Sequence, residues 1–292
     1  MDGDTYDVEG KTCLVTGANS GIGKATATSL ARMGAHVVMV CRSRARGEAA
    51  QEEIQASSTK SSVDLWIADL ASQEDIHALA AGVQGEYQKL HVLVNNAGAL
   101  VSPRRETVDG LEYTFALNHL APFLLTNLLL DLLEASAPAR IVNVTSGVHA
   151  WGRIRFHDLQ GARSYGALRA YNQSKLGNVL FTYELARKLE GSGVTVNCVH
   201  PGAVNTNFGN DAKSAFATLL RVVKPLMRSP RKGAETVLFA ATAPELEGMT
   251  GQYFVNKEAK ASSRRSYDEE LARRLWEVSA ELTGLEGAAR PA

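Results

Sequence analysis

The sequence predicts a doubly wound α/β fold, in which helices cover both faces of a single parallel sheet of about seven strands. Short runs rich in β-branched residues alternate with amphipathic helical patterns from the start of the chain to about Val199. Most of these runs are apolar on both faces, which is typical of strands that are covered on each side. The 292 residues contain no linker long or polar enough to split them, so we expect a single domain over residues 1–292.

Seven segments have the length and composition of strands. They are Thr12–Val15, His36–Val40, Val63–Ala68, Val92–Val94, Ile141–Val144, Val194–Val199 and Gln252–Val255. Amphipathic helices are predicted between them, for example over Gly23–Met33 and Gly47–Ala56. The apolar stretch from Phe115 to Leu133 is interrupted by several polar residues and a proline, so we predict a buried core helix there and no membrane span.

Two segments interrupt this alternation. Trp151 to Arg169 is irregular in pattern, and Thr206 to Arg231 is rich in apolar residues and carries two prolines. Both should lie beyond the carboxyl ends of strands, where open α/β sheets bind ligands. We therefore expect a substrate-covering segment over about residues 203–231, although its apolar run is equally compatible with plain core. A C-terminal amphipathic helix is predicted over about residues 267–285.

The composition limits the classes of function. The formal net charge is zero and charged residues make up 21% of the chain, so no excess of positive charge favours nucleic acid or an anionic membrane. The first ten residues are acidic and polar and lack the features of a secretory signal. The odd number of cysteines, without CxxC spacing, indicates neither a disulfide framework nor a zinc site. We expect a soluble, cytoplasmic protein in which Cys13, Cys41 and Cys198 are buried small hydrophobic residues.

The segment KTCLVTGANSGIG, from Lys11 to Gly23, has the pattern of a dinucleotide-binding turn. An apolar strand is followed by Gly17, Gly21 and Gly23 and then by a helix. Glycine lets the backbone adopt permissive dihedrals and approach a pyrophosphate, while the start of the helix offers free N–H groups and a positive dipole end. A glycine-rich turn without a ligand is the alternative, but this one follows the first strand, where the Rossmann fingerprint belongs.

The end of the second predicted strand, VCRS, indicates the choice of cofactor. An acidic side chain here would bind the adenosine ribose and repel a 2′-phosphate, whereas this chain has Arg42, with Arg44 and Arg46 close by. A guanidinium matches a phosphate, so NADP(H) is favoured over NAD(H). The alternative is a solvated helix start. Asp69 is placed to meet the adenine edge, or to cap a helix.

The segment YNQSK places Tyr171 four residues before Lys175 on a helix that is predicted to begin near Ala167. Residues i and i+4 share one helix face, so the phenol and the ammonium can point into one site. A phenol with a pKa of about 10 is a poor base at neutral pH, and a neighbouring cation favours the phenolate. The pattern therefore predicts Tyr171 as a general acid/base. Such a spacing also occurs by chance, so the argument depends on the other motifs.

Taken in order, these motifs resemble the short-chain dehydrogenase/reductase family, and the resemblance runs from about Lys11 to Phe254. The segments that carry it are TGANSGIG at 16–23, Asp69-Leu70, Asn95-Asn96-Ala97-Gly98, Ser146 within IVNVTSG, Tyr171 and Lys175 within YNQSK, and His200-Pro201-Gly202 followed by Thr206. We find no break in these motifs.

The resemblance implies a role for each matching residue. Tyr171 would exchange a proton with the substrate oxygen, Ser146 would hydrogen-bond that oxygen, and Lys175 would hold the nicotinamide ribose and lower the pKa of the tyrosine. Asn118 would position a water that links the lysine to solvent, with a satisfied core amide as the alternative. The residues implied to bind the cofactor are Gly17, Asn19, Ser20, Gly21, Ile22, Gly23, Arg42, Asp69, Leu70, Asn95, Ala97, Gly98, Tyr171, Lys175, Pro201, Gly202, Val204 and Thr206.

Within the family, GANSGIGKATA, VCRS, ALNHLAPFLLTNLLL and IVNVTSGVHAWG look most like the retinol dehydrogenase and WW-domain-containing oxidoreductase branch. This resemblance implies NADP(H) and a lipophilic alcohol or carbonyl, such as a retinoid, a steroid or an aromatic compound. Many members carry an N-terminal membrane anchor, which we do not expect here, so the location and the natural substrate are expected to differ. A homodimer or homotetramer is also implied, with contacts through the helices around Asn118 and Tyr171.

Other combinations of residues carry less weight. His119, His149, His157 and His200 lack metal-ligand spacing, so we expect no metal. A Ser146–His149 hydrolase dyad is conceivable, but no GxSxG elbow surrounds the serine. Two further alternatives remain: a nucleotide-binding regulator without turnover, against which the competent residue types at every catalytic position argue, and a reductase of a carrier-linked ketone.

Overall fold

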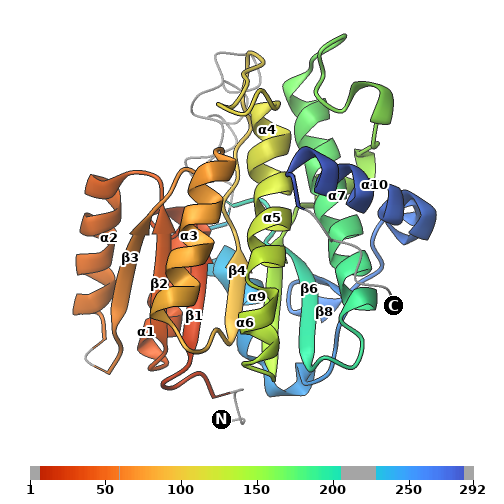
Figure 1. Ribbon diagram of the computed structural model, residues 1–292. Helices are drawn as coiled ribbons and strands as arrows, with labels where there is room; N and C mark the ends of the chain where they lie inside the picture. The colour runs from red at the N-terminus through yellow and green to blue at the C-terminus, as the bar shows by residue number, and fades with distance from the viewer. Residues whose placement is uncertain (1–6, 59, 205–227, 286–292) are drawn as a thin grey trace.

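The computed structural model describes residues 7–58, 60–204 and 228–285. An eight-stranded sheet runs through these residues in the order β3-β2-β1-β4-β5-β6-β7-β8, with helices on both faces (Figure 1). Strands β1 to β7 are parallel, and the short β8 is antiparallel to β7. The predicted fold class is confirmed, and β8 is an addition to the seven predicted strands.

The strands are β1 (Thr12–Thr16), β2 (His36–Cys41), β3 (Val63–Ile67), β4 (Val92–Asn95), β5 (Ala139–Val144), β6 (Val194–His200), β7 (Tyr253–Val255) and β8 (Glu258–Ala259). The helices and helical turns are α1 (Gly21–Arg32), α2 (Arg44–Ala56), α3 (Gln73–Glu86), α4 (Tyr113–Phe115), η1 (Ala116–Leu120), α5 (Ala121–Leu128), α6 (Leu130–Glu134), η2 (Gly147–Trp151), η3 (Phe156–Asp158), α7 (Ala167–Lys188), α9 (Pro230–Thr242), η5 (Pro244–Leu246), η6 (Arg264–Tyr267) and α10 (Glu269–Leu282). All seven predicted strands are present, with bounds close to those expected.

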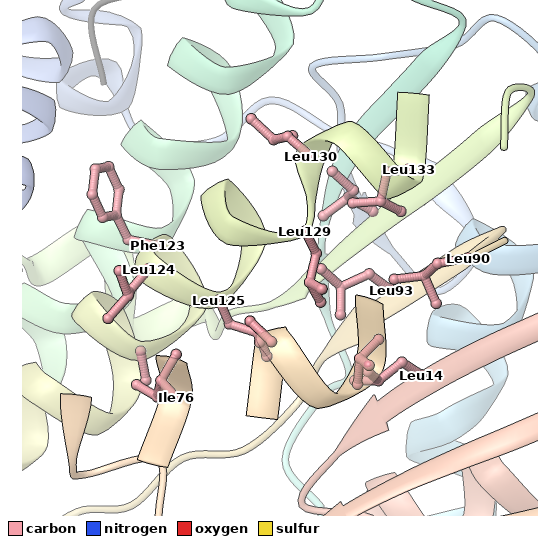
Figure 2. Close-up of a cluster of buried hydrophobic side chains, with 14 of the residues drawn as sticks. Leu14, Ile76, Leu90, Leu93, Phe123, Leu124, Leu125, Leu129, Leu130 and Leu133 are labelled. Atoms are coloured by element: carbon pink, nitrogen blue, oxygen red, sulfur yellow. The ribbon is translucent and has the colours of Figure 1, made fainter. Parts of the chain in front are cut away.

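Side chains of each strand alternate between two buried layers. In β1, Leu14 belongs to a cluster with residues of α3, α5 and α7, whereas Cys13 and Val15 belong to a cluster with residues of α1, α2 and α9. In Figure 1, α3, α5 and α7 stand in front of the sheet, and Figure 2 shows part of this leucine-rich layer, with side chains of α3, α5 and α6 beside those of β1 and β4. Because both faces are covered, the strands are apolar at most positions.

The segment predicted as a core helix from Phe115 to Leu133 is buried but is not one continuous α-helix. It is divided into α4, η1, α5 and α6, and η1 is a π-helical turn that contains Asn118 and His119. A π turn inserts one extra residue and thereby changes which neighbours the flanking residues meet. None of the helices in the described ranges is both long enough and apolar enough to cross a bilayer.

The C-terminal helix α10 packs across α7 on the side of the molecule opposite α2 (Figure 1). Its Trp276 lies against Phe123 of α5 and Phe181 of α7, with ring centroids 4.9 Å and 5.8 Å away. The helix begins two residues later than predicted because Asp268 is its N-cap and accepts a hydrogen bond from the N–H of Leu271.

Candidate active site

Four loops that carry predicted site residues meet at one edge of the sheet. They follow β1, β4, β5 and β6, which are parallel, so their carboxyl ends lie at the same edge. The strand order reverses between β1 and β4, and open α/β sheets bind ligands in the crevice at such a switch point. The topology therefore brings the glycine turn and the Asn95–Gly98 segment to the same edge as Ser146, Pro201 and Gly202.

The turn after β1 contains glycines at positions where a side chain would be costly. Gly17 has a φ of +66°, which is costly for a residue with a Cβ. Gly23 packs against the turn itself: a Cβ on Gly23 would lie 2.3 Å from the carbonyl oxygen of Gly17 and 2.4 Å from the Nδ2 of Asn96. Helix α1 can therefore start this close to the strand ends only because residue 23 has no side chain.

The start of α1, at Gly21, suits an anionic group. No side chain caps its first N–H groups, and its first turn contains no acidic residue. Asn19 is half-buried and the N-cap residue Ser20 is exposed. Unpaired N–H groups and the positive end of the helix dipole bind phosphate, so these residues fit the pyrophosphate of a dinucleotide. Ile22 in the same turn lies beside the segment that follows β6.

Thr16 and Asn96 hold the turn after β1 against the turn after β4, a role that we did not predict for either residue. The Thr16 hydroxyl accepts hydrogen bonds from the N–H groups of Asn96 and Ala97 at 2.9 and 3.0 Å. In return, the Asn96 side-chain amide donates to the carbonyl of Thr16 at 2.8 Å. These bonds hold the two loops at the switch point in a fixed position. The adjacent asparagines Asn95 and Asn96 are the feature of the sequence that could have indicated this contact.

Asn95 itself, predicted as a cofactor residue, has its side chain inside the protein. Its Nδ2 donates to Thr126 Oγ1 and to Asn143 Oδ1, both at 2.9 Å, and the residue is 6% exposed. This amide ties β4 to β5 and α5. Ala97 and Gly98, by contrast, lie at the sheet edge, where the Cα of Ala97 is 3.1 Å from the position of a Cβ on Gly17.

Arg42, immediately after β2, is exposed and carries a charge that no carboxylate neutralises within the described ranges. Its Nη1 donates a hydrogen bond to the Tyr113 hydroxyl at 2.5 Å. Arg44, by comparison, lies 3.7 Å from a carboxylate oxygen of Glu48. Arg42 is therefore a cation at the end of β2 that is open to an anionic ligand.

Asp69 and Leu70 follow β3. Asp69 Oδ1 accepts a hydrogen bond from the N–H of Ala71 at 3.0 Å. The helix-capping alternative for Asp69 is wrong, because Ser72 is the N-cap of α3 and its hydroxyl accepts from the N–H of Asp75. Leu70 is 7% exposed, and its side chain packs into the core against α3.

Asn118 is fully buried in η1, and both ends of its amide are bonded. Its Oδ1 accepts from the N–H of Ala99 at 2.8 Å, and its Nδ2 donates to the Ala99 carbonyl at 2.9 Å and to Ser174 Oγ at 3.0 Å. These bonds fit the core-amide alternative. The residue nevertheless lies beside the site, because a Cβ on Gly98 would be 3.1 Å from Asn118 Oδ1 and 3.7 Å from Lys175 Nζ.

Ser146, Tyr171 and Lys175 lie together where the end of β5 meets α7. Ser146 is close enough to the Tyr171 phenol to lower its pKa, and Lys175 Nζ lies 5.7 Å from the centroid of the Tyr171 ring. The Lys175 ammonium donates to the carbonyl of Val144 at 2.9 Å, and the Thr145 hydroxyl donates to the carbonyl of Lys175 at 2.9 Å. The i, i+4 spacing thus directs both side chains toward the end of β5.

Burial governs the protonation of both groups. It raises the pKa of Tyr171 above its ordinary value, and the hydrogen bond with Ser146 lowers that pKa to a lesser extent. It lowers the pKa of Lys175 to about 8. The protein's own groups therefore do not give the lowered tyrosine pKa that the resemblance implies, because the phenol is desolvated and the ammonium binds the Val144 carbonyl. The Tyr171 phenol is therefore protonated at neutral pH.

The segment after β6 reaches the start of α1. A Cβ on Gly233 of α9 would lie 2.6 Å from Val204 and 3.2 Å from Ile22, so both side chains pack at the same place. Val204 thus stands at the edge of the glycine turn. Thr206 and residues 205–227 of the predicted substrate-covering segment lie outside the described residues.

The hydrolase alternative does not fit the geometry. His149 Nδ1 lies 2.9 Å from the carbonyl oxygen of Ser146, and His149 Nε2 accepts a hydrogen bond from the N–H of Ser263 at 3.1 Å. Because Nε2 is an acceptor, the ring proton is on Nδ1 and is donated to the carbonyl, away from the serine hydroxyl. The part of the chain that the structure describes also holds no cluster of three His, Cys, Asp or Glu residues that could bind a metal.

Comparison with known proteins places this arrangement in a family. Residues 11–216 match the family model described as short chain dehydrogenase. Retinol dehydrogenase 12 of Mus musculus is 45% identical over 279 residues, which cover 96% of this chain and 88% of that protein. The structure of an uncharacterized protein from Mycobacterium paratuberculosis is 34% identical, covers 96% of each chain and has a TM-score of 0.77.

A second solved structure contains a nicotinamide cofactor. It is described as a candidate NAD(P)-dependent gluconate 5-dehydrogenase from Beutenbergia cavernae with NADP bound at low occupancy. It is 27% identical, covers 86% of this chain and 96% of its own, and has a TM-score of 0.69. The protein belongs to the short-chain dehydrogenase/reductase family of oxidoreductases, in the branch that contains the retinol dehydrogenases.

Proposed function

We propose that the protein is an NADP(H)-dependent oxidoreductase that interconverts an alcohol and a ketone or aldehyde, with Tyr171 as the acid/base. The observation that carries this proposal is the position of Tyr171 beside Ser146 and Lys175, at the sheet edge that also holds the glycine turn. A bound nicotinamide would supply the hydride chemistry that no side chain can provide.

In the reducing direction, the substrate oxygen accepts hydrogen bonds from the Ser146 hydroxyl and the Tyr171 phenol. As the carbonyl carbon is reduced, the Tyr171 proton passes to that oxygen and leaves a phenolate. The ammonium of Lys175 stabilises this negative charge, because a charge interaction is strong in a buried, poorly solvated site. In the oxidising direction, the same proton returns to Tyr171.

Two observations support NADP(H) as the cofactor. The residue at the end of β2 is Arg42, whose charge no carboxylate neutralises within the described ranges, and the short-chain dehydrogenase-like structure from Beutenbergia cavernae holds NADP. A lipophilic alcohol or carbonyl, such as a retinoid, a steroid or an aromatic compound, is the proposed substrate class, and the retinol dehydrogenases among the relatives support it.

The acid/base assignment is tested by Tyr171→Phe, which retains the ring and removes the transferable proton. We expect the turnover number to fall by at least about 100-fold, in line with the usual contribution of general acid/base catalysis. The measurement follows NADPH absorbance with a panel of medium-chain, aromatic, retinoid and steroid carbonyls. Tyr183→Phe is the matched control, because Tyr183 is on the same helix but bonds Ser262 and not Ser146.

Retention of most of the wild-type rate by Tyr171→Phe would show that another group transfers the proton. Tight NADPH binding without turnover of any substrate in the panel would favour the nucleotide-binding regulator instead. Activity that appears only with thioester-bound ketones would point to a carrier-linked substrate.

The cofactor assignment is tested separately by Arg42→Ala. We expect the dissociation constant for NADPH to rise about 100-fold and that for NADH to change less than about threefold, because only NADPH carries the 2′-phosphate that a guanidinium binds. Both constants can be measured by titration of protein fluorescence. Equal losses for the two dinucleotides would refute the phosphate role of Arg42.

A further inference from the structure

Arg42 and Tyr113 form a contact between two loops that the cofactor assignment leaves unexplained. Arg42 follows β2, and Tyr113 begins α4, 71 residues later in the chain. The Nη1 of Arg42 donates to the hydroxyl of Tyr113 at 2.5 Å, a short distance for a hydrogen bond with a charged donor. The exposed guanidinium is thus attached to a residue that is only 6% exposed.

The Tyr113 ring is held from several sides. It packs in an apolar cluster with Ala71 and Val101, and its N–H donates to the carbonyl of Arg105 at 2.9 Å. The guanidinium of Arg105 lies over the ring, with its Cζ 5.0 Å from the centroid. The hydroxyl therefore has little freedom to move, and it can serve as a fixed point for a mobile side chain.

The backbone at Tyr113 is equally constrained. The preceding residue, Glu112, is buried and caps α4, because its carboxylate accepts hydrogen bonds from the N–H groups of Thr114 and Phe115 at 2.9 and 2.8 Å. The N–H of Glu112 in turn donates to Gln160 Oε1 at 2.6 Å. The start of α4 is therefore anchored independently of Arg42.

The phenol leaves the charge of Arg42 available. Burial raises the pKa of Tyr113, Arg42 opposes this, and Asp69 raises the pKa further, so the hydroxyl stays neutral. A neutral acceptor orients a guanidinium without cancelling its charge, unlike a carboxylate. It also occupies a single N–H, and an arginine has four others to offer to a phosphate.

We propose that Tyr113 is a positioning residue for cofactor specificity, which holds the Arg42 guanidinium in the orientation that binds the 2′-phosphate of NADP(H). The proposal rests on the proposed use of NADP(H) and adds a residue to it. An arginine that is already oriented loses less rotational freedom when it binds a phosphate, so the gain in affinity is specific to the dinucleotide that carries that phosphate.

The test is a double-mutant cycle on cofactor binding with Tyr113→Phe, Arg42→Ala and the double variant. Phenylalanine retains the packed ring and removes only the hydroxyl. We expect Tyr113→Phe to raise the dissociation constant for NADPH about five- to tenfold and to leave that for NADH within about twofold. In the Arg42→Ala background, the same substitution should have no further effect on either dinucleotide. Tyr87→Phe is the matched control, because its buried hydroxyl bonds Trp66 and Asp64.

Three results would overturn the proposal. Equal weakening of NADPH and NADH by Tyr113→Phe would show that the hydroxyl shapes the site without selecting the cofactor. An unchanged effect in the Arg42→Ala background would show that Tyr113 does not act through Arg42. Tighter NADPH binding by Tyr113→Phe would mean that the phenol competes with the phosphate. If Arg42→Ala itself weakens both dinucleotides equally, the proposed cofactor preference fails, which is a separate outcome.

Discussion

At the scale of single residues, Lys175 is the least ordinary group of the candidate site. Its side chain is 4% exposed, and burial lowers the pKa of its ammonium to about 8 from 10.5. The ammonium donates to the Val144 carbonyl at 2.9 Å, which compensates for part of the lost hydration. A lysine of this kind is still charged at neutral pH, but it is easier to deprotonate than a surface lysine.

This pKa has a consequence for stability. Between pH 8 and 10.5 the unfolded chain binds a proton at Lys175 that the folded chain has lost, so the contribution of this lysine to the free energy of unfolding should rise with pH in that window. The rise is at most about 1.4 kcal/mol per pH unit. We expect the difference in unfolding free energy between wild type and Lys175→Met to increase from pH 7.5 to pH 10, as measured by urea unfolding.

The comparison with Lys175→Met removes the contribution of the tyrosines and cysteines, because both proteins contain them. Lys89→Met, at an exposed lysine, is the control and should show no such trend. A difference between wild type and Lys175→Met that stays constant or falls over this range would contradict the lowered pKa of Lys175.

At the scale of elements, the π-helical turn η1 serves two neighbours at once. Asn118 bonds Ala99 and Ser174 at the candidate site. His119, the next residue, bonds Ser279 of α10 at 2.9 Å and is surrounded by aromatic rings. Burial lowers the pKa of His119 to about 4, so this histidine is neutral at physiological pH. One turn therefore joins the site to the C-terminal helix.

The attachment of α10 depends chiefly on Trp276. The indole packs on Phe123 and Phe181, and the ammonium of Lys188 lies 4.9 Å from its ring centroid. We expect Trp276→Ala to lower the free energy of unfolding by roughly 3 to 5 kcal/mol, because a large buried aromatic side chain is removed. Thermal or urea unfolding measures this loss. Trp151→Ala is the control, since Trp151 is 74% exposed, and a similar loss in both variants would contradict the packing role of Trp276.

At the scale of the whole molecule, α10 bears on how subunits could associate. The family resemblance implies a homodimer or homotetramer with contacts through the helices around Asn118 and Tyr171. Helix α10 covers α7 and, through Trp276, also α5. A subunit contact through the part of α7 that α10 covers would therefore involve α10.

The sheet could be predicted from sequence because its signal is local. A run such as CLV in β1 is apolar at each position since each face meets its own helix layer, and the bounds follow from that pattern. The course of residues 113–134 could not be predicted in the same way. Nearly every side chain there is buried, so apolar and polar residues do not alternate with a helical period. Without that period, the extra residue of a π turn cannot be recognised in the sequence.

The candidate site likewise contains residues whose positions could be predicted from the sequence and residues whose roles could not. The positions of Ser146, Tyr171 and Lys175 follow from strand order and helix spacing, both of which the sequence indicates. The roles of Asn95 and Asn96 cannot be predicted in this way, because the two residues are adjacent and of the same type. The Asn95 side chain points into the core, whereas the Asn96 side chain bonds the glycine turn. The contact of Arg42 with Tyr113 joins distant parts of the chain, and no local pattern reports it.

The single extra residue in η1 determines the directions in which the side chains after it point. Each residue of a helix turns the chain by about 100°, so removing residue 116 or 117 would move His119 into the direction that Asn118 has now. An imidazole would then face Ala99, and the Asn118 carboxamide would lose its hydrogen bonds with Ala99 and Ser174. The length of this turn therefore decides which side chain reaches the candidate site.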